Sequence, residues 1–342
     1  MNQNFSSILI QWYRSNGRDL PWRHTRDPYA IWLSEVILQQ TRIVQGLGYW
    51  QRFMERFPNV ESLAAASEDE VLLLWQGLGY YSRARHLHEA ARQIVALGHF
   101  PSTLKEIRGL SGVGDYTAAA IASLAFGLDV TAVDGNVYRV LSRVFGLDTP
   151  IDTTKGKHLI AALAQDLLPK GHAAEFNQAI MDFGALQCTP RNAHCDACPL
   201  LDQCVAAREG RVGELPVKQK STVVKERFFT YIYISCQGQT AIHRRKAGDI
   251  WQGLWEPVLI EGGLLPNWQG KWTLLCKDVK HQLTHRLIHA DFYLLETEQR
   301  PDLPEDYIWI DEDKFNEYAH PQLITTHPLP LPTKGGEMQP QK

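Results

Sequence analysis

The stretch Leu110-Ser-Gly-Val-Gly-Asp-Tyr-Thr117 follows one segment of helical pattern and opens another. Gly112 and Gly114 would let the turn expose backbone N–H groups at the start of the second helix, where a phosphate oxygen can bind. The same glycines also suit a plain turn between two packed helices, so both interpretations stand at this point. In either case the stretch predicts a helical hairpin within a mainly helical part of the chain.

Outside the hairpin, the pattern of apolar residues divides the chain into two domains. Over residues 1–208 apolar residues recur every three or four positions, which is typical of helices. The polar segment 209–227 is expected to be a linker, and aromatic and β-branched runs over 228–325 predict the strands of an α+β domain. Residues 326–342 are rich in Pro and Gly, and we expect them to be disordered.

Composition limits the classes of protein to which the chain can belong. Its 342 residues, 44% of them hydrophobic, are enough to bury two cores. The N-terminus has no signal-peptide pattern and no apolar run is long enough for a membrane span, so we expect a cytoplasmic protein without a membrane partner. The formal net charge is −3, without the basic excess that marks many nucleic-acid binders. On charge alone, DNA binding would not be expected.

Four of the six cysteines lie close together, with the spacing C-x6-C-x2-C-x5-C. A quartet this tight would staple only one loop if it formed disulfides, whereas four converging thiolates suit a metal centre. Zinc sites usually take their ligands as two close pairs, and here only one pair is close, so the spacing favours an iron–sulfur cluster over zinc. The quartet consists of Cys188, Cys195, Cys198 and Cys204.

Two carboxylates each have a structural and a chemical interpretation. Asp134 ends an apolar run and precedes a helical pattern, which is typical of a helix N-cap, but it could also place a carboxylate at the mouth of a cleft beside the hairpin. Glu35 lies in the apolar stretch IWLSEVILQQ (31–40). It lies either on the exposed side of an amphipathic helix or in a buried position, where its charged form would be disfavoured.

The hairpin, the VDGNV stretch (133–137) and the cysteine spacing together resemble the endonuclease III superfamily of DNA glycosylases. Within it, the chain is similar to the MutY branch of adenine DNA glycosylases over nearly all of residues 8–208. The other stretches that carry this likeness are LPW (20–22), WLSEVILQQT (32–41), GLGYYSRAR (77–85) and FNQAIMDFGALQC (176–188). The resemblance implies a helix-hairpin-helix glycosylase with two helical subdomains and a [4Fe-4S] cluster in the loop 188–204. It also implies activity on adenine paired with 8-oxoguanine or, less efficiently, with guanine.

The resemblance further implies roles for individual residues. Endonuclease III-like enzymes carry a lysine where this chain has Tyr116, and a tyrosine cannot form the Schiff base that leads to strand cleavage. Glu35 would protonate the departing adenine at N7, and Asp134 would stabilise the positive charge that develops on the sugar. Tyr116 and Asn136 would orient these two carboxylates. We therefore expect a monofunctional glycosylase.

Additional residues match positions that contact DNA in this family. Some would line the base pocket, and others would fill the gap left by the extruded adenine or bind the phosphate backbone. The cluster loop would bring Arg191 close to that backbone. The matching residues are Trp22, Arg23, Gln40, Thr41, Leu78, Tyr80, Gly112, Gly114 and Glu175. We expect a monomer that binds double-stranded DNA and associates with the nucleoid in a bacterial cytoplasm.

The C-terminal part contains AIHRRKAGDIWQGLWEPV (241–258), followed by an α+β pattern. In this it resembles the MutT-like, Nudix-fold domain that the MutY branch carries. A Nudix hydrolase holds Mg²⁺ on a glutamate-dense helix, and no such cluster lies between 255 and 300, so hydrolysis is not expected. By resemblance, the domain reads 8-oxoguanine through Leu283, Thr284 and His285, where the family usually has Phe-Ser-His. Histidines at 281, 285 and 289 would form a metal-binding face on a helix, but the strand-like sequence after them favours β-structure.

Two other functions remain open on the sequence. One is a bifunctional glycosylase and lyase that acts on oxidised pyrimidines, although Tyr116 and the C-terminal domain argue against it. The other is a non-catalytic DNA-binding protein stabilised by a metal. In that case, replacing Glu35 or Asp134 would leave function intact.

Overall fold

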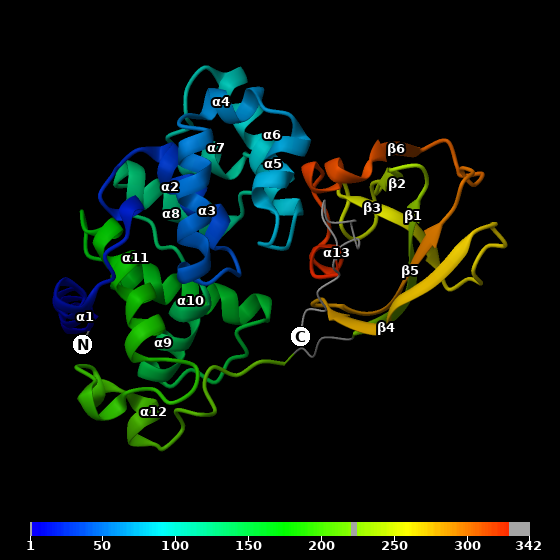
Figure 1. Ribbon diagram of the computed structural model, residues 1–342. Coiled ribbons are helices and arrows are strands. Elements are labelled where there is room, and N and C mark those ends of the chain that lie inside the picture. Colours follow the sequence, from blue (N-terminus) through cyan, green and yellow to red (C-terminus); the bar gives the residue numbers. More distant parts are fainter. Residues whose placement is uncertain (1, 220–223, 328–342) are drawn as a thin grey trace. The chain divides into compact units, whose positions relative to one another are not determined.

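A computed structural model describes residues 2–219 and 224–327 of the chain (Figure 1). They form two compact units, one of Met1–Ala65 with His86–Ser221 and the other of Ala66–Arg85 with Thr222–Lys342. The domain boundaries expected from the sequence remain predictions, and this grouping differs from them in placing 66–85 with the second unit. Most of the segment expected to be disordered, 326–342, lies outside the described residues. None of the described helices is long and apolar enough to cross a membrane.

The first unit consists of helices, which confirms the mainly α fold expected for the N-terminal part. Sequence signals set several helix ends: Asp27 caps α2 through two backbone N–H groups, and Thr103 with Glu106 forms a capping box on α7. The longer helices are α1 (Asn2–Asn16), α2 (Pro28–Leu38), α3 (Ile43–Arg56), α4 (Val60–Ala65), α6 (Ser82–Leu97), α7 (Leu104–Arg108), α8 (Asp115–Phe126), α9 (Gly135–Phe145), α10 (Thr154–Leu167) and α11 (Ala173–Asp182). Short helical segments are η1 (Pro21–Arg23), η2 (Phe183–Gln187), η3 (Cys195–Ala197), η4 (Leu201–Gln203) and α12 (Val205–Arg208).

These helices pack in two groups. α2 packs on α3 and α8, whereas α1, α9, α10 and α11 enclose a cluster of buried side chains that includes Phe5, Leu141, Phe176 and Phe183. Fully burying a side chain of this size contributes about 1.5–3 kcal/mol. α11 also contacts α8, so the two groups meet and hold α2, α8, α9 and α11 around one cavity.

The predicted helical hairpin is confirmed by α7, which ends at Arg108, and α8, which begins at Asp115. Gly112 has a φ of +72°, and a Cβ at this residue would lie 2.5 Å from the Cβ of His86. A side chain is therefore excluded both by backbone conformation and by space. Gly114 occupies the N-cap position of α8 and provides no side-chain cap, so the first N–H groups of this helix are not bonded by a capping side chain.

The segment that follows α12, expected to be a linker, contacts the helical unit up to residue 219. Leu215 is 2% exposed, and its carbonyl accepts a hydrogen bond of 3.0 Å from Nε of Arg143 on α9. The N–H of Ile151 donates to the carbonyl of Val217 at 3.0 Å. The segment up to 219 therefore packs on the helical unit, because it contributes a buried apolar side chain and satisfies backbone and guanidinium donors there.

The second unit contains a six-stranded sheet, which confirms the expected α+β class. The strand order is β4-β5-β1-β3-β2-β6, with β1 parallel to β5 and the other pairs antiparallel. Alternation along β1 buries Tyr231 and Tyr233 on one face and Ile232 and Ile234 on the other. The strands are β1 (Lys225–Ser235), β2 (Gln239–Arg244), β3 (Trp255–Glu261), β4 (Lys271–Gln282), β5 (Arg286–Glu296) and β6 (Tyr307–Asp311), followed by η5 (Glu312–Glu317) and α13 (Gln322–Thr325).

Residues 66–85 contact this domain within the second unit. Glu68, at the start of α5 (Glu68–Trp75), pairs with Arg244 of β2 at 2.9 Å. The Tyr81 hydroxyl donates to the carbonyl of His320 at 3.2 Å. The histidines at 281 and 289 lie on β4 and β5, in the β-structure favoured by the sequence.

Candidate active site

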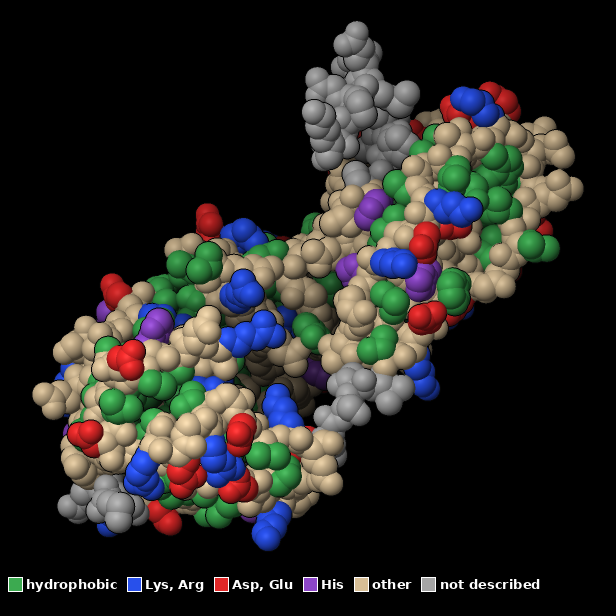
Figure 2. Space-filling view, turned by 90° about the horizontal axis from the view of Figure 1, so that it is seen from below, with side chains coloured by type: hydrophobic (Ala, Val, Ile, Leu, Met, Phe, Trp, Pro, Cys, Tyr) green, Lys and Arg blue, Asp and Glu red, His purple; other side chains and the backbone are tan. Residues whose placement is uncertain are grey.

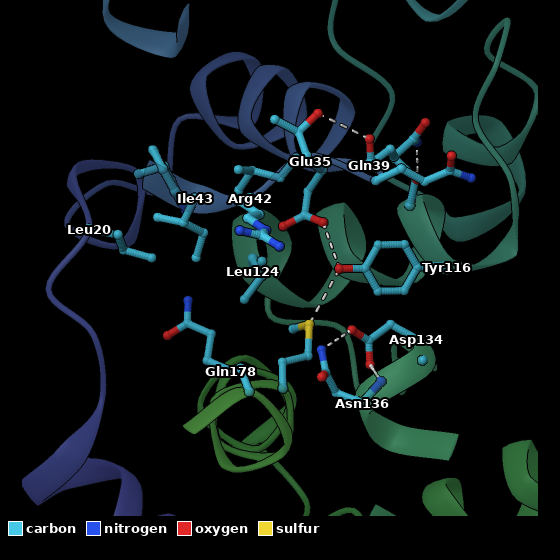
Figure 3. Close-up of a pocket in the computed structure, with 18 of the residues that line it drawn as sticks. Leu20, Glu35, Gln39, Arg42, Ile43, Tyr116, Leu124, Asp134, Asn136 and Gln178 are labelled. Atoms are coloured by element: carbon cyan, nitrogen blue, oxygen red, sulfur yellow. Dashed lines mark hydrogen bonds between the residues drawn. The ribbon is translucent and has the colours of Figure 1, made fainter. Parts of the chain in front are cut away.

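A cavity of about 870 Å³ opens in the helical unit, and Figure 3 shows the side chains around it. Glu35 reaches it from α2, Tyr116 from the start of α8, and Asp134 with Asn136 from the start of α9. Gln178 approaches from α11 on the opposite side (Figure 3). The structure therefore brings together the four residues for which the sequence suggested catalytic roles, from α2 and from the consecutive helices α8 and α9 about 80–100 positions later.

Glu35 borders the cavity and is half-buried among the surrounding side chains. Burial, together with the negative charge of Asp134, raises the pKa of Glu35 to about 7. A hydrogen bond from Tyr116 and the positive charge of Arg23 oppose this rise. The surface position considered from the sequence does not occur. Glu35 can hold a proton near neutral pH, which an ordinary glutamate with a pKa of 4.5 cannot.

Tyr116 stays protonated and donates its hydroxyl proton. Its oxygen lies 2.9 Å from Oε2 of Glu35 and 3.3 Å from Sδ of Met181 (Figure 3). Burial and the two nearby carboxylates raise the pKa of Tyr116 well above 10, so the phenol remains a donor throughout the physiological range. A tyrosine at this position therefore orients Glu35 and carries no amine.

Asp134 is the N-cap residue of α9, as one sequence interpretation proposed, and it also faces the cavity. Oδ1 accepts the backbone N–H groups of Asn136 and Val137 at 2.8 and 2.9 Å, and Oδ2 accepts Nδ2 of Asn136 at 2.6 Å. Burial raises the pKa of Asp134 above its usual value, although these three donors and Arg139 oppose the rise. Three donors favour the ionised carboxylate, so the site contains one proton-holding carboxyl and one hydrogen-bonded carboxylate.

Arg139 holds Asn136 in place, a role that the sequence did not reveal. Nη2 of Arg139 donates to Oδ1 of Asn136 at 2.8 Å, which leaves Nδ2 directed at Asp134. Arg139 also donates to the carbonyls of Gly184 at 2.5 Å and Cys188 at 2.8 Å. A Cβ on Gly184 would lie 2.5 Å from Cβ of Asn136, so the two chain segments touch here. The usable sequence signal was an arginine one helical turn after Asn136.

Arg23 and Trp22 both line the cavity, where the sequence placed them. Arg23 is bound to the buried Asp182, at the end of α11, through Nη1 at 2.7 Å and Nη2 at 2.8 Å. Arg18 binds the same carboxylate and also lines the cavity. Asp182 was not identified from the sequence, because its partners lie about 160 positions away in the chain.

Glu175 does not reach this cavity, contrary to expectation. It lies in the first turn of α11 and pairs with Arg14 at 2.7 Å on the surface of the unit. Gln178, one helical turn later, lines the cavity, and its Oε1 accepts a 2.6 Å hydrogen bond from the Tyr13 hydroxyl. Gln178 therefore lines the cavity in this structure, whereas the contact of Glu175 with adenine stays a prediction.

The remaining DNA-contact candidates divide between two cavities. Four of them line the cavity of the helical unit: Gln40, Thr41, Gly112 and Gly114. The other five line a separate cavity of about 560 Å³ in the second unit: Leu78, Tyr80, Leu283, Thr284 and His285. In that cavity the Tyr80 and Thr284 hydroxyls form a hydrogen bond of 2.9 Å. Tyr80 is 50% exposed and has a φ of +46°, an uncommon backbone conformation for a residue with a side chain.

The cysteine quartet lies after α11, on η2–η4 and the loops between them. Cys188, Cys198 and Cys204 pack against the helical core, and the charges of the other three cysteines act on the Cys198 thiol. Nη1 of Arg143 lies 3.4 Å from Sγ of Cys188. Among the described residues, no group of three or more His, Cys, Asp or Glu side chains is placed to hold a metal ion. Arg191 is exposed on the same loop.

Charged side chains are interspersed over the face of the molecule shown in Figure 2, where Lys and Arg (blue) alternate with Asp and Glu (red). This agrees with the small net charge of −3. The face shown in Figure 2 is therefore not uniformly basic.

Comparisons with known proteins place the chain in a family. Residues 33–170 match the HhH-GPD superfamily of base excision DNA repair proteins, and residues 230–326 match a NUDIX domain. The adenine DNA glycosylase of Buchnera aphidicola (subspecies Schizaphis graminum) is 36% identical over 253 residues, 73% of each chain. The human adenine DNA glycosylase is 44% identical over 213 residues, which are 59% of this chain but 39% of the human protein.

Solved structures show the same helical fold. A thermostable thymine-DNA glycosylase is 32% identical, with a TM-score of 0.57 over 61% of this chain and 97% of its own. An endonuclease III–DNA complex is 21% identical, with a TM-score of 0.53 over 61% and 98% of the two chains. The paired carboxyls, the helical hairpin and the Nudix-like second domain accompany these matches. The chain therefore belongs to the adenine DNA glycosylase family of the HhH-GPD superfamily of base excision repair enzymes.

Proposed function

We propose that the protein is a monofunctional adenine DNA glycosylase that removes adenine paired with 8-oxoguanine and, less efficiently, with guanine. The observation that carries the proposal is the cavity in which a proton-holding Glu35, bonded to Tyr116, faces a hydrogen-bonded Asp134. Cleavage of an N-glycosidic bond needs both an acid for the departing base and a negative charge for the sugar cation.

The proposed reaction begins when adenine leaves the duplex and enters the cavity, at a cost of a few kcal/mol. Glu35 transfers its proton to N7 of adenine, and the bonding electrons between C1′ and N9 leave with the base. Asp134 stabilises the positive charge that forms on the sugar. Water then adds at C1′ and loses a proton, which yields free adenine and an abasic site. Tyr116 holds Glu35, while Asn136 and Arg139 hold Asp134.

Recognition of 8-oxoguanine is proposed for the cavity of the second unit. Leu78, Tyr80, Leu283, Thr284 and His285 gather there, and they offer apolar surface, hydroxyls and an imidazole to a modified base. The Tyr80–Thr284 hydrogen bond keeps both hydroxyls at one place on its wall. Leu283 supplies no aromatic ring, so stacking at this position is weaker than with the phenylalanine usual in the family.

A [4Fe-4S] cluster is proposed for the cysteine quartet. Four thiols on one loop suit this cofactor, and three of them pack against the helical core. Arg143 supplies a cationic donor to Sγ of Cys188, which compensates a thiolate that binds iron. When bound, the cluster would order the loop that carries Arg191, and it has no chemical part in hydrolysis. We also propose that the protein binds double-stranded DNA as a monomer in the cytoplasm and nucleoid of a bacterium, as suits its likeness to Buchnera relatives.

A single-turnover assay with three duplexes tests the substrate. Adenine opposite 8-oxoguanine should be released fastest, adenine opposite guanine more slowly, and adenine opposite thymine not at all. The abasic strand should stay intact until alkali is added, because Tyr116 cannot form a Schiff base. Trapping of a covalent adduct by borohydride in high yield would favour the bifunctional lyase. Tight binding of all three duplexes without base release would favour the non-catalytic protein.

Purified protein should be brown and contain about four irons per chain. The visible absorption that makes the protein brown should disappear in Cys198→Ser, together with most of the iron. Cys236→Ser is the matched control, because Cys236 is buried in the core of the second unit, so iron should be retained. Colourless protein that contains one zinc per chain would contradict the assignment.

A further inference from the structure

Asp182 is a buried carboxylate that two arginines of the cavity share. It lies at the end of α11 and is 0% exposed. Its oxygens accept Nη1 and Nη2 of Arg23 at 2.7 and 2.8 Å and the backbone N–H of Arg18 at 2.8 Å. Nε and Nη2 of Arg18 donate to the same carboxylate. A buried charge with this many donors holds its partners in one geometry.

Arg23 could otherwise act on the general acid. It lines the same cavity as Glu35, and its positive charge lowers the pKa of both Glu35 and Tyr116. Among the described residues, however, no ion pair joins Arg23 to Glu35, because the guanidinium is directed to Asp182 and to the carbonyl of Arg18 at 2.8 Å.

The other charged and titratable groups around Glu35 come from several elements. Tyr116 faces it from α8 and Asp134 from the start of α9, whereas Arg23 lies on η1. Arg18, Arg42 and Asp115 also line the cavity. Burial has the largest effect on the pKa of Glu35, and the positive charge of Arg23 lowers it, so a closer approach of Arg23 would make Glu35 lose its proton more readily.

We propose that Asp182 is a positioning residue: it holds the Arg23 guanidinium away from the Glu35 carboxyl, so that Glu35 keeps the proton it must donate. This inference rests on the proposed glycosylase function. An opposite charge within about 4–6 Å lowers the pKa of a carboxyl by roughly 1–3 units. An Arg23 released from Asp182 and free to approach Glu35 would therefore leave Glu35 ionised at neutral pH and without a proton for adenine.

The negative charge of Asp182 also opposes the effect of the Arg23 charge on other side chains of the pocket. Burial raises the pKa of Tyr13; Arg23, 5.5 Å from its ring, lowers that pKa, and Asp182 raises it, so the two charges act on this hydroxyl in opposite directions. The Tyr13 hydroxyl in turn binds Gln178 on the cavity wall. Arg18, Arg23 and Asp182 together thus carry one net positive charge in place of the two of the free arginines.

The experiment compares the pH dependence of single-turnover adenine release in full-length variants. In Asp182→Asn the alkaline fall in rate should move to lower pH by roughly 1–3 units relative to wild type. In Arg23→Met it should move to higher pH, and the rate should drop at every pH because a pocket residue is lost. The double variant Arg23→Met, Asp182→Asn should follow Arg23→Met, since no guanidinium remains to be held. Asp166→Asn, on the exposed side of α10, is the control and should match wild type.

A purely structural role predicts a different result. If Asp182→Asn slows the reaction by the same factor at all pH values, or if the double variant keeps the shift of Asp182→Asn, the inference is overturned. If Asp182→Asn fails to fold, the test uses Arg23→Met. A fall in rate at the same alkaline pH as in wild type would then contradict the proposal. Wild-type protein that releases no adenine at any pH would instead refute the proposed function itself.

Discussion

Replacing Glu35 by glutamine is expected to lower the single-turnover rate of adenine release by roughly 10²–10⁴-fold at pH 7, the usual contribution of a general acid. Glutamine keeps the shape of the side chain and can still accept the hydrogen bond from Tyr116, which is 2.9 Å long in the wild-type protein. It cannot supply a proton to the departing base. The measurement is single-turnover release from a duplex with adenine opposite 8-oxoguanine, at saturating protein.

The pH dependence provides a second readout of the same variant. With a pKa of about 7, Glu35 loses its proton as the pH rises through neutrality, so the wild-type rate should fall above pH 7. Glu35→Gln should be slow at all pH values and should lack this fall. Glu55→Gln, on the exposed side of α3, should retain both the wild-type rate and its pH profile. A Glu35→Gln variant as fast as wild type would refute Glu35 as the acid.

Ionisation of the Glu35 carboxyl should lower the free energy of unfolding at high pH. Its pKa rises from 4.5 in the unfolded chain to about 7 in the folded protein, so the folded state binds the proton more tightly. Its contribution to stability is therefore fully present below pH 4.5 and is lost as the pH rises toward 7, by up to about 3 kcal/mol. Glu35→Gln should accordingly unfold at a higher temperature than wild type at pH 8, but not at pH 4.5.

Replacing Asp134 by asparagine is expected to slow adenine release by roughly 10²–10³-fold, as when an electrostatic group aimed at a transition-state charge is removed. Asparagine is as good an N-cap as aspartate, so α9 should still begin at Gly135, although the new amide cannot accept the hydrogen bond from Nδ2 of Asn136. The variant therefore separates the acceptor and charge of Oδ2 from the N-cap role of Oδ1. The measurement is the single-turnover rate, compared with thermal unfolding of the same preparation.

Asp27 offers a matched control for this substitution. It caps α2 through the backbone N–H groups of Tyr29 and Ala30, and it does not line the cavity. Asp27→Asn should have the wild-type rate, although α2 carries Glu35. If Asp134→Asn also keeps the wild-type rate, the carboxylate is not needed to stabilise the sugar cation, and its N-cap role is sufficient.

The sequence predicted what depends on local pattern. Glycine spacing predicted the hairpin, and the change from helical to strand-like periodicity predicted two structural classes. Burial of Glu35 could not be derived from its apolar neighbours alone, because α2 is apolar nearly all round and a helix of this kind has no evident inner face. Only the packing of α2 on α8 places that side chain beside Tyr116.

The sequence was least informative about contacts between distant segments. Asp182 binds residues about 160 positions earlier, and no local pattern indicates such a pairing. The ion pair between Glu175 and Arg14 is another such contact, because these two residues also lie far apart in the chain. The segment up to 219 looked polar enough to be free, yet one buried leucine fastens it to the helical unit.

Gly184 changes how natural variation in this family can be interpreted. The residue has no functional group, and an alanine there would look harmless in an alignment. Because its α-carbon approaches Asn136 so closely, any added methyl would intrude 2.5 Å from that neighbour and displace the amide that steadies Asp134. A substitution at residue 184 is therefore expected to affect the active site through Asn136, without itself contacting the substrate.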